Sequence, residues 1–213
     1  ASANRIRQYL GVVVQRIVYE LRGISCLDLD KILPKKNIMC SRSFGNPVNS
    51  KTIIKDFITE YSIRAAEKVR QQNSRAQGIY IFLQTNRFKK EKQYNSGIMV
   101  GLNFPCCDTS TIIKLASKAI DQIFQPGYSY HKAGIMMLDL IPSDIHQKDL
   151  FQNTTYLLSD QRMKVIDSLN KKFGSGIITH GKVRRKGKNK WKSRSFYLSP
   201  RYTTQWDELP HAN

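Results

Sequence analysis

The sequence predicts an α+β protein built around a ferredoxin-like domain, in which two helices cover one face of a four-stranded antiparallel sheet. Two observations support this class. Residues 35–141 contain six segments in the order strand, helix, strand, strand, helix, strand, which is the split β-α-β pattern. Both helical segments carry apolar residues on one side only, so each buries one face. The opposite face of the sheet is therefore expected to stay open.

A helix is expected first, over residues 5–22, with Gly23 ending it. Its apolar residues form a wide stripe: Ile6, Leu10, Val13, Val14, Ile17 and Leu21. A bare stripe of this size promotes association. We therefore expect this helix to fold back on the following domain or to pack against another copy of the chain.

The first half of the domain begins with a strand over residues 37–44, which Gly45-Asn46-Pro47 is expected to break. A long amphipathic helix follows over residues 50–72, with Ser50 as its N-cap. An apolar run then predicts a strand over residues 78–85.

The second half starts after a basic loop at residues 86–96. A strand is expected over 97–104, a helix from Asp108 or Thr109 to Phe124, and the last strand over 132–140. The chain continues with a polar connector over 142–155.

A third helix is expected over residues 159–173, within a small C-terminal α/β extension. Eleven basic residues and no acidic residue lie between Lys171 and Arg201. A solvated tail would account for this charge, but interleaved aromatic residues favour some packed structure.

The charge of the chain indicates a polyanionic partner. Its 213 residues include 35 Lys and Arg against 16 Asp and Glu, which leaves a net charge of +19. Such an excess repels itself in the folded protein and is useful beside nucleic acid. A merely soluble basic protein is the simpler alternative.

Enzymatic chemistry and bound cofactors are not expected. No nucleophile motif or phosphate-binding loop is present, and the four cysteines and four histidines lack metal-ligand spacing. No apolar run approaches the ~20 residues of a membrane span, and no secretory signal begins the sequence. We expect a cytoplasmic protein with free thiols and no membrane partner.

Candidate DNA-binding residues lie at the ends of the predicted strands. Hydroxyl, amide and cationic side chains there suit phosphate oxygens, which accept several short hydrogen bonds. The candidates are Ser41, Arg42, Ser43, Gln84, Thr85, Arg87, Lys89, Lys90 and Lys132.

A short peptide motif follows the domain at Gln147-Lys148-Asp149-Leu150-Phe151. Gln147 could fix the register of an extended peptide in a groove, while Leu150 and Phe151 fill an apolar pocket. The alternative is a stray apolar pair that caps the core.

Several stretches resemble the C-terminal half of Y-family translesion DNA polymerases, specifically the UmuC type, which includes the catalytic subunit of bacterial DNA polymerase V. They are Tyr19 to Gly23, Cys40 to Gly45, Arg64 to Lys68, Tyr130 to Gly134 and Leu198 to Thr204. The last of these is typical of the UmuC branch, and the resemblance covers nearly the whole chain.

The resemblance implies a role for each segment. Residues 5–23 correspond to a thumb helix, 35–141 to the DNA-gripping little finger, 142–155 to a linker with the sliding-clamp motif, and 156–213 to the UmuC-type extension. It also implies a template-primer, the sliding clamp, a UmuD-type subunit and a recombinase filament as partners in bacterial DNA damage tolerance, SOS mutagenesis included.

The catalytic carboxylates of this family lie in a palm domain, where they hold Mg²⁺. Nothing in these residues matches those motifs, so we expect no catalysis by this chain alone, although the parent protein would polymerise DNA. The main alternative is a ferredoxin-like RNA-binding module. Such modules stack bases on aromatic residues of their central strands, and residues 97–102 offer none.

Overall fold

A computed structural model describes residues 2–26, 33–144, 155–181 and 198–209, with side chains omitted at 155–158. The chain divides into two compact units, Ala1–Pro34 and Lys35–Asn213, which we describe separately. None of the described helices is both long enough and apolar enough to cross a membrane.

The first unit contains one helix, α1 (Ala3–Leu21), which is broken in the middle. The backbone leaves helical geometry at Gly11, where φ is 82° and ψ is 174°. The prediction of a single regular helix over 5–22 is therefore wrong, because glycine adopts a positive φ that other residues disfavour.

The end of α1 agrees with the sequence. Gly23 has a φ of 80°, and its amide donates to the carbonyl of Glu20, as in a glycine C-cap. The stripe residues Leu10, Val13, Ile17 and Leu21 are exposed, so their burial against a partner stays a prediction.

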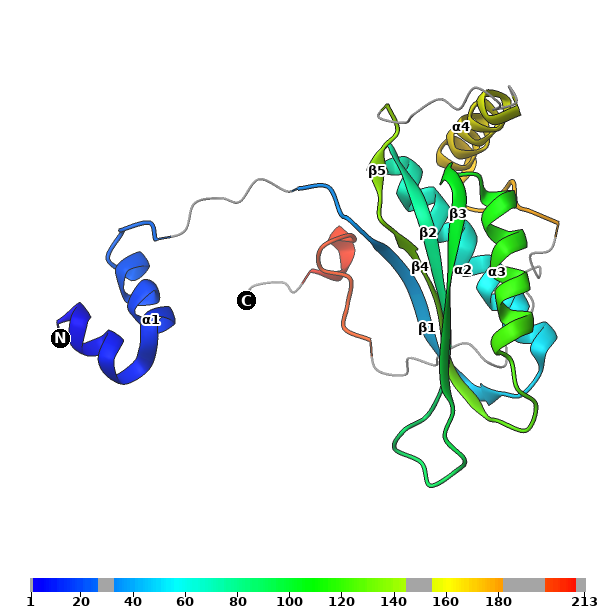
Figure 1. Cartoon of the computed structure of the whole chain (residues 1–213). Coiled ribbons are helices and arrows are strands. Elements are labelled where there is room, and N and C mark those ends of the chain that lie inside the picture. Colours follow the sequence, from blue (N-terminus) through cyan, green and yellow to red (C-terminus); the bar gives the residue numbers. More distant parts are fainter. Residues whose placement is uncertain (1, 27–32, 145–154, 182–197, 210–213) are drawn as a thin grey trace. The chain divides into compact units, whose positions relative to one another are not determined.

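The second unit contains the expected antiparallel sheet (Figure 1). Its strands are β1 (Ile38–Val48), β2 (Ser74–Thr85), β3 (Asn95–Cys106) and β4 (Tyr130–Leu138). Their spatial order is β1-β4-β2-β3, so β4 and β2 are central. A two-residue strand that was not expected, β5 (Ile141–Pro142), pairs with the start of β2.

Two helices, α2 (Lys51–Gln71) and α3 (Thr109–Ile123), cover one face of this sheet (Figure 1). The core lies between the two layers, where Ile79, Ile81 and Leu83 of β2 are fully buried. The α+β class and the four-stranded sheet are thus confirmed.

Strand β1 is longer than predicted. It continues through Gly45-Asn46-Pro47 to Val48, with a register shift between Ser43 and Val48. β1 lies at the edge of the sheet, where a proline and a bulge are tolerated. The expected break is therefore a bulge.

The two helix starts differ in their capping. Ser50 lies at the N-cap of α2 but its side chain makes no capping hydrogen bond. Asp108 caps α3, and its carboxylate accepts from the Thr111 amide at 2.8 Å. The predicted N-cap of α3 is therefore confirmed in detail.

The extension begins with helix α4 (Thr155–Phe173), which packs on the sheet domain through Met163, only 1% exposed. A short 3-10 helix, η1 (Trp206–Glu208), lies near the C-terminus. Neither 155–181 nor 198–209 contains a strand, so the expected β component is absent from the described part of the extension.

Candidate nucleic-acid interface

A row of polar side chains crosses one end of the open face. Ser43 of β1 is paired with Lys132 of β4, Lys132 with Gln84 of β2, and Gln84 with Asn95 of β3. Directly paired residues in an antiparallel sheet lie on the same face. The four side chains, which we call the polar row, therefore span three strand spacings, about 14 Å.

Two aromatic side chains of β2, Phe82 and Tyr80, follow the polar row on the open face. The Phe82 ring stacks with Tyr80 at a centroid distance of 6.0 Å, and Lys132 Nζ lies 5.9 Å from the Phe82 centroid. A Cβ added at Gly134 would lie 2.5 Å from the Ser41 Cβ and 2.6 Å from the Phe82 ring. The ring thus occupies space that glycine leaves free, and the Lys132 ammonium lies near this ring.

Successive side chains of β1 point to opposite faces of the sheet, so the three candidates Ser41, Arg42 and Ser43 do not share one face. Ser41 and Ser43 lie on the open face, whereas Arg42 shares the helix side of the strand with buried Cys40 and Phe44. Burial, and then the charge of Glu60, raise the pKa of Tyr61 in α2 to about 12. The positive charge of Arg42 acts in the opposite direction on this pKa, which places Arg42 near Tyr61. Arg42 therefore lies on the opposite face of β1 from the polar row.

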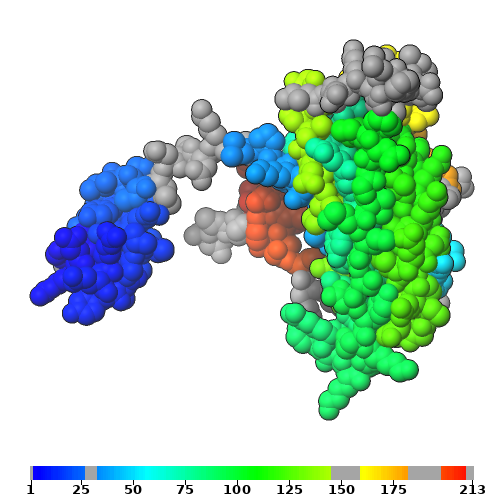
Figure 2. Space-filling model, viewed as in Figure 1, coloured from blue at the N-terminus to red at the C-terminus, as the bar shows by residue number. Residues whose placement is uncertain are grey.

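The remaining candidates lie in the β2–β3 hairpin, which projects beyond the same end of the sheet (Figures 1 and 2). Arg87, Lys89 and Lys90 are exposed there, and Lys89 lies 3.5 Å from Glu91. The Thr85 hydroxyl accepts from the Tyr94 amide at 2.9 Å and so holds the base of the hairpin. The role of Thr85 in DNA binding stays a prediction.

Two side chains on this surface were not predicted from the sequence. Asn95 completes the polar row, and Phe88 is exposed in the hairpin beside Lys92, a residue of the predicted basic loop. No sequence signal identified Asn95, because only the strand register places it opposite Gln84.

The clamp candidates Gln147, Leu150 and Phe151 lie outside the described residues, so their assignment stays a prediction. Within the described ranges, no three His, Cys, Asp or Glu side chains are grouped to hold a metal ion.

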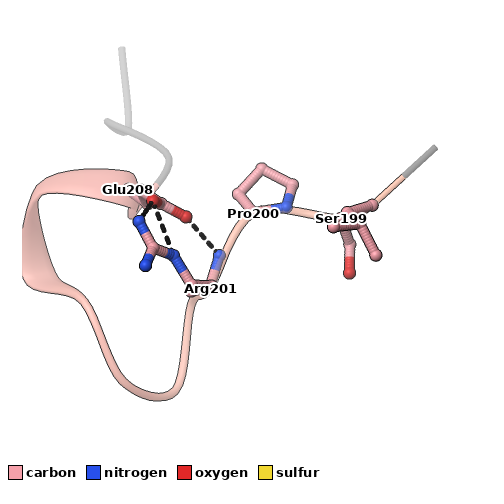
Figure 3. Close-up of a pocket in the computed structure, with 5 residues that line it drawn as sticks. Ser199, Pro200, Arg201 and Glu208 are labelled. Carbon is pink, nitrogen blue, oxygen red and sulfur yellow. Dashed lines mark hydrogen bonds and ion pairs between the residues drawn. The ribbon is translucent and has the colours of Figure 1, made fainter. Parts of the chain in front are cut away.

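A pocket near the C-terminus is lined by residues of one segment: Leu198, Ser199, Pro200, Arg201 and Glu208 (Figure 3). The Arg201 guanidinium donates to Glu208 Oε1 at 2.6 Å and 3.0 Å. Hydrogen bonds from the Arg201 side chain and backbone lower the pKa of Glu208. The two charges therefore pair with one another inside this segment.

The structure changes one argument against RNA binding. Residues 97–102 belong to β3, which is an edge strand, and the central strand β2 carries Tyr80 and Phe82 on the open face. The sequence argument therefore considered the wrong strand. Phe82 is only 5% exposed, however, and is not available for a base to stack on.

Together these features define an α+β domain with a polar row on the open face of its sheet and a basic hairpin that projects beyond that sheet. A family profile described as "impB/mucB/samB family C-terminal domain" matches residues 35–150, and the chain belongs to this family. A second profile, a domain of unknown function (DUF4113), matches residues 161–212.

Similar proteins of known sequence support the same conclusion. Protein UmuC of Salmonella typhimurium is 36% identical over 96% of this chain and 49% of that protein. Protein ImpB of Salmonella typhimurium is 36% identical, and Protein MucB of Escherichia coli 34%, each over all of this chain and half of the relative. The chain thus spans about half the length of these relatives, and the resemblance to the UmuC type is confirmed.

Among solved structures, one described as "Insertion ternary complex of Dbh DNA polymerase" aligns with a TM-score of 0.43 and 11% identity. The alignment covers 67% of this chain and 39% of that chain.

Proposed function

We propose that this chain is the DNA-binding and clamp-binding portion of an error-prone translesion DNA polymerase, and that its sheet grips the backbone of a template-primer. The observation that carries the proposal is the polar row of Ser43, Lys132, Gln84 and Asn95. Membership of the impB/mucB/samB family and the net charge of +19 support it.

The chemistry of the polar row suits phosphate better than base edges. One ammonium, one hydroxyl and two amides can all donate to phosphate oxygens without reading sequence. Arg87, Lys89 and Lys90 extend the positive surface at the same end of the sheet. Binding should therefore tolerate any DNA sequence.

Salt dependence tests this proposal directly. The logarithm of the DNA affinity should fall linearly with the logarithm of the salt concentration between roughly 50 and 200 mM, because neutralised phosphates release counterions. Lys132→Gln should reduce the slope by about 0.9 in a duplex titration followed by fluorescence anisotropy.

Lys118→Gln is the matched control, since Lys118 is exposed on α3 in the helix layer. Affinity independent of salt, or an equal effect of both substitutions, contradicts the proposed face. Tighter binding to RNA than to DNA in the same titration would favour the RNA-binding module instead.

Clamp binding through Gln147, Leu150 and Phe151 belongs to the same proposal and rests on the sequence motif. Burying the two apolar side chains would contribute about 1.5–3 kcal/mol each. Leu150→Ala with Phe151→Ala should therefore abolish binding in a calorimetric titration with the bacterial sliding clamp. The matched control changes Lys148 and Asp149 to alanine, and equal binding by both double variants contradicts the motif.

The remaining parts of the proposal, catalysis and partner proteins, concern the longer polymerase to which these residues would belong. Nucleotide transfer with Mg²⁺ would occur in its palm, in the bacterial cytoplasm. A UmuD-type subunit and a recombinase filament are its proposed partners. These proposals rest on family membership.

A further inference from the structure

The tip of the β2–β3 hairpin presents an aromatic ring to solvent. Phe88 is 83% exposed, although it lies in a loop of nine residues, 86–94, that is otherwise polar or charged apart from Tyr94 at its base. A single exposed apolar residue is common on protein surfaces. The fixed geometry of this loop and the charges around the ring distinguish Phe88.

Hydrogen bonds from two amide side chains fix the loop. Asn86 Oδ1 accepts from the Phe88 amide at 3.0 Å. The Gln93 side-chain nitrogen lies 3.1 Å, 2.8 Å and 3.0 Å from the carbonyl oxygens of Asn86, Lys89 and Glu91. The backbone that carries Phe88 is therefore ordered before any ligand arrives, which reduces the entropic cost of binding.

Positive charge surrounds the ring. The Arg87 guanidinium carbon lies 4.9 Å from the ring centroid, a distance at which a cation and an aromatic face attract. Lys89, Lys90 and Lys92 follow within four residues, against the single acidic residue Glu91. This combination of an aromatic ring and several cations is the one that binds single-stranded nucleic acid.

We propose that Phe88 stacks on an unpaired base of the single-stranded DNA that continues from the duplex held by the polar row. The inference rests on the DNA binding proposed above and adds a ligand class to it. Bases within a duplex already stack on their neighbours, so an unpaired base offers its face at a lower cost. A ring without hydrogen-bonding groups accepts any base, so this contact is independent of sequence.

The test compares the full chain and the Phe88→Ala variant on a blunt duplex and on the same duplex with a single-stranded overhang. Loss of the stack should weaken overhang binding roughly 5- to 100-fold, as for other base–aromatic stacks, and leave blunt-duplex binding unchanged. The salt dependence should not change, since Phe88 neutralises no phosphate. Phe88→Trp should retain overhang binding.

Phe173→Ala is the matched control, because Phe173 is also exposed, at 58%, and has Lys172 Nζ 5.3 Å from its ring centroid. It should leave both affinities unchanged. Circular dichroism verifies that each variant is folded.

Other results separate the two proposals. Salt-dependent duplex binding together with an unaltered overhang affinity of Phe88→Ala overturns the stacking inference alone. An equal loss on both substrates also overturns it and indicates a wedge in the duplex. If the full chain binds neither substrate, the proposed function and the stacking inference both fail.

Discussion

At the scale of single residues, Gly134 leaves room for an aromatic ring on the open face. It lies in the central strand β4, between Ser41 of β1 and Phe82 of β2. Its missing side chain lets the Phe82 ring lie down on the sheet.

We expect Gly134→Ala to lower the free energy of unfolding by about 1–3 kcal/mol, because the added methyl group overpacks the space held by Phe82 and Ser41. Urea denaturation measures this loss. Gly101→Ala in β3 is the control, since nothing lies within 4 Å of its Cβ position, and it should change stability by less than ~1 kcal/mol. Equal losses in both variants would contradict this role for Gly134.

Asp108 is a second residue with a defined chemical role. Its carboxylate caps α3 through Thr111 and accepts from Ser159 Oγ at 2.6 Å and from Arg162 at 3.2 Å. Burial alone would raise the pKa of Asp108, but the hydrogen bonds from Ser159, Thr111 and Arg162 lower it below its usual value. The ionised carboxylate therefore stabilises both α3 and its contact with α4.

This lowered pKa predicts a loss of stability in acid. The contribution of Asp108 is complete above the unfolded-state pKa of about 3.9 and is lost as the pH falls through the lower folded-state pKa. Thermal unfolding midpoints between about pH 5 and pH 2 should fall less steeply for Asp108→Asn than for the parent chain, since asparagine caps a helix without titrating. Identical acid profiles would show that Asp108 has no such role.

At the scale of elements, ion pairs attach α4 to the sheet domain. Arg70, near the end of α2, donates from Nε and Nη2 to both oxygens of Asp167 at 2.6 Å and 2.8 Å. Its Nη1 donates to the Cys107 carbonyl and the Thr109 hydroxyl. The Arg70 side chain thus connects three elements: α2, α4 and the start of α3. Its paired hydrogen bonds to Asp167 have the bidentate geometry for which arginine is suited.

A second contact lies beside the first. Arg75 of β2 pairs with Asp160 of α4, and the Cys107 thiol lies 3.6 Å from the same carboxylate. Burial and then Asp160 raise the pKa of Cys107 to about 12. Cys107 therefore remains a neutral, unreactive thiol at this contact.

Arg70→Met should destabilise the docking of α4 by about 1–3 kcal/mol, because it removes charged hydrogen bonds at a largely buried site. Hydrogen exchange of the α4 amides should become faster by the corresponding factor. The matched variant is Arg64→Met on the same helix, whose pair with Glu60 is exposed and contributes at most about 0.5 kcal/mol. Unchanged exchange in Arg70→Met would mean that apolar packing alone holds α4.

At the scale of the whole molecule, the apolar stripe of the first unit is the feature that favours association. Leu10, Val13, Ile17 and Leu21 are all exposed in α1. Exposed apolar residues that cluster on one element commonly mark an interaction site. The net charge of +19 opposes self-association at low salt and does so less as salt rises.

Removal of residues 1–34 should therefore reduce self-association, with the largest difference from the full chain at high salt. Sedimentation velocity at about 0.05 and 0.5 M salt measures this effect, over the range in which charge screening becomes strong. Replacing Leu10, Val13 and Ile17 together by serine in the full chain should have the same effect. Equal association of the full and shortened chains would place the contact elsewhere.

The sequence alone determined the class of the domain, its six elements in order and the family. These properties follow from local patterns: apolar spacing distinguishes the helix at 51–71 from the strand at 74–85, and Gly23 and Asp108 mark helix ends within a few residues. It also determined the charge and therefore the expected class of partner. It did not predict the bend at Gly11, because a helical pattern continues across a glycine.

Only the tertiary structure decided which of the predicted residues lie together. Strand order and register bring Ser43, Lys132, Gln84 and Asn95 into one row, and alternation moves Arg42 to the other side of β1. The contact of Arg70 with Asp167 joins residues 97 positions apart. Such pairings depend on packing and loop closure across the whole domain, and no local window of sequence contains that information.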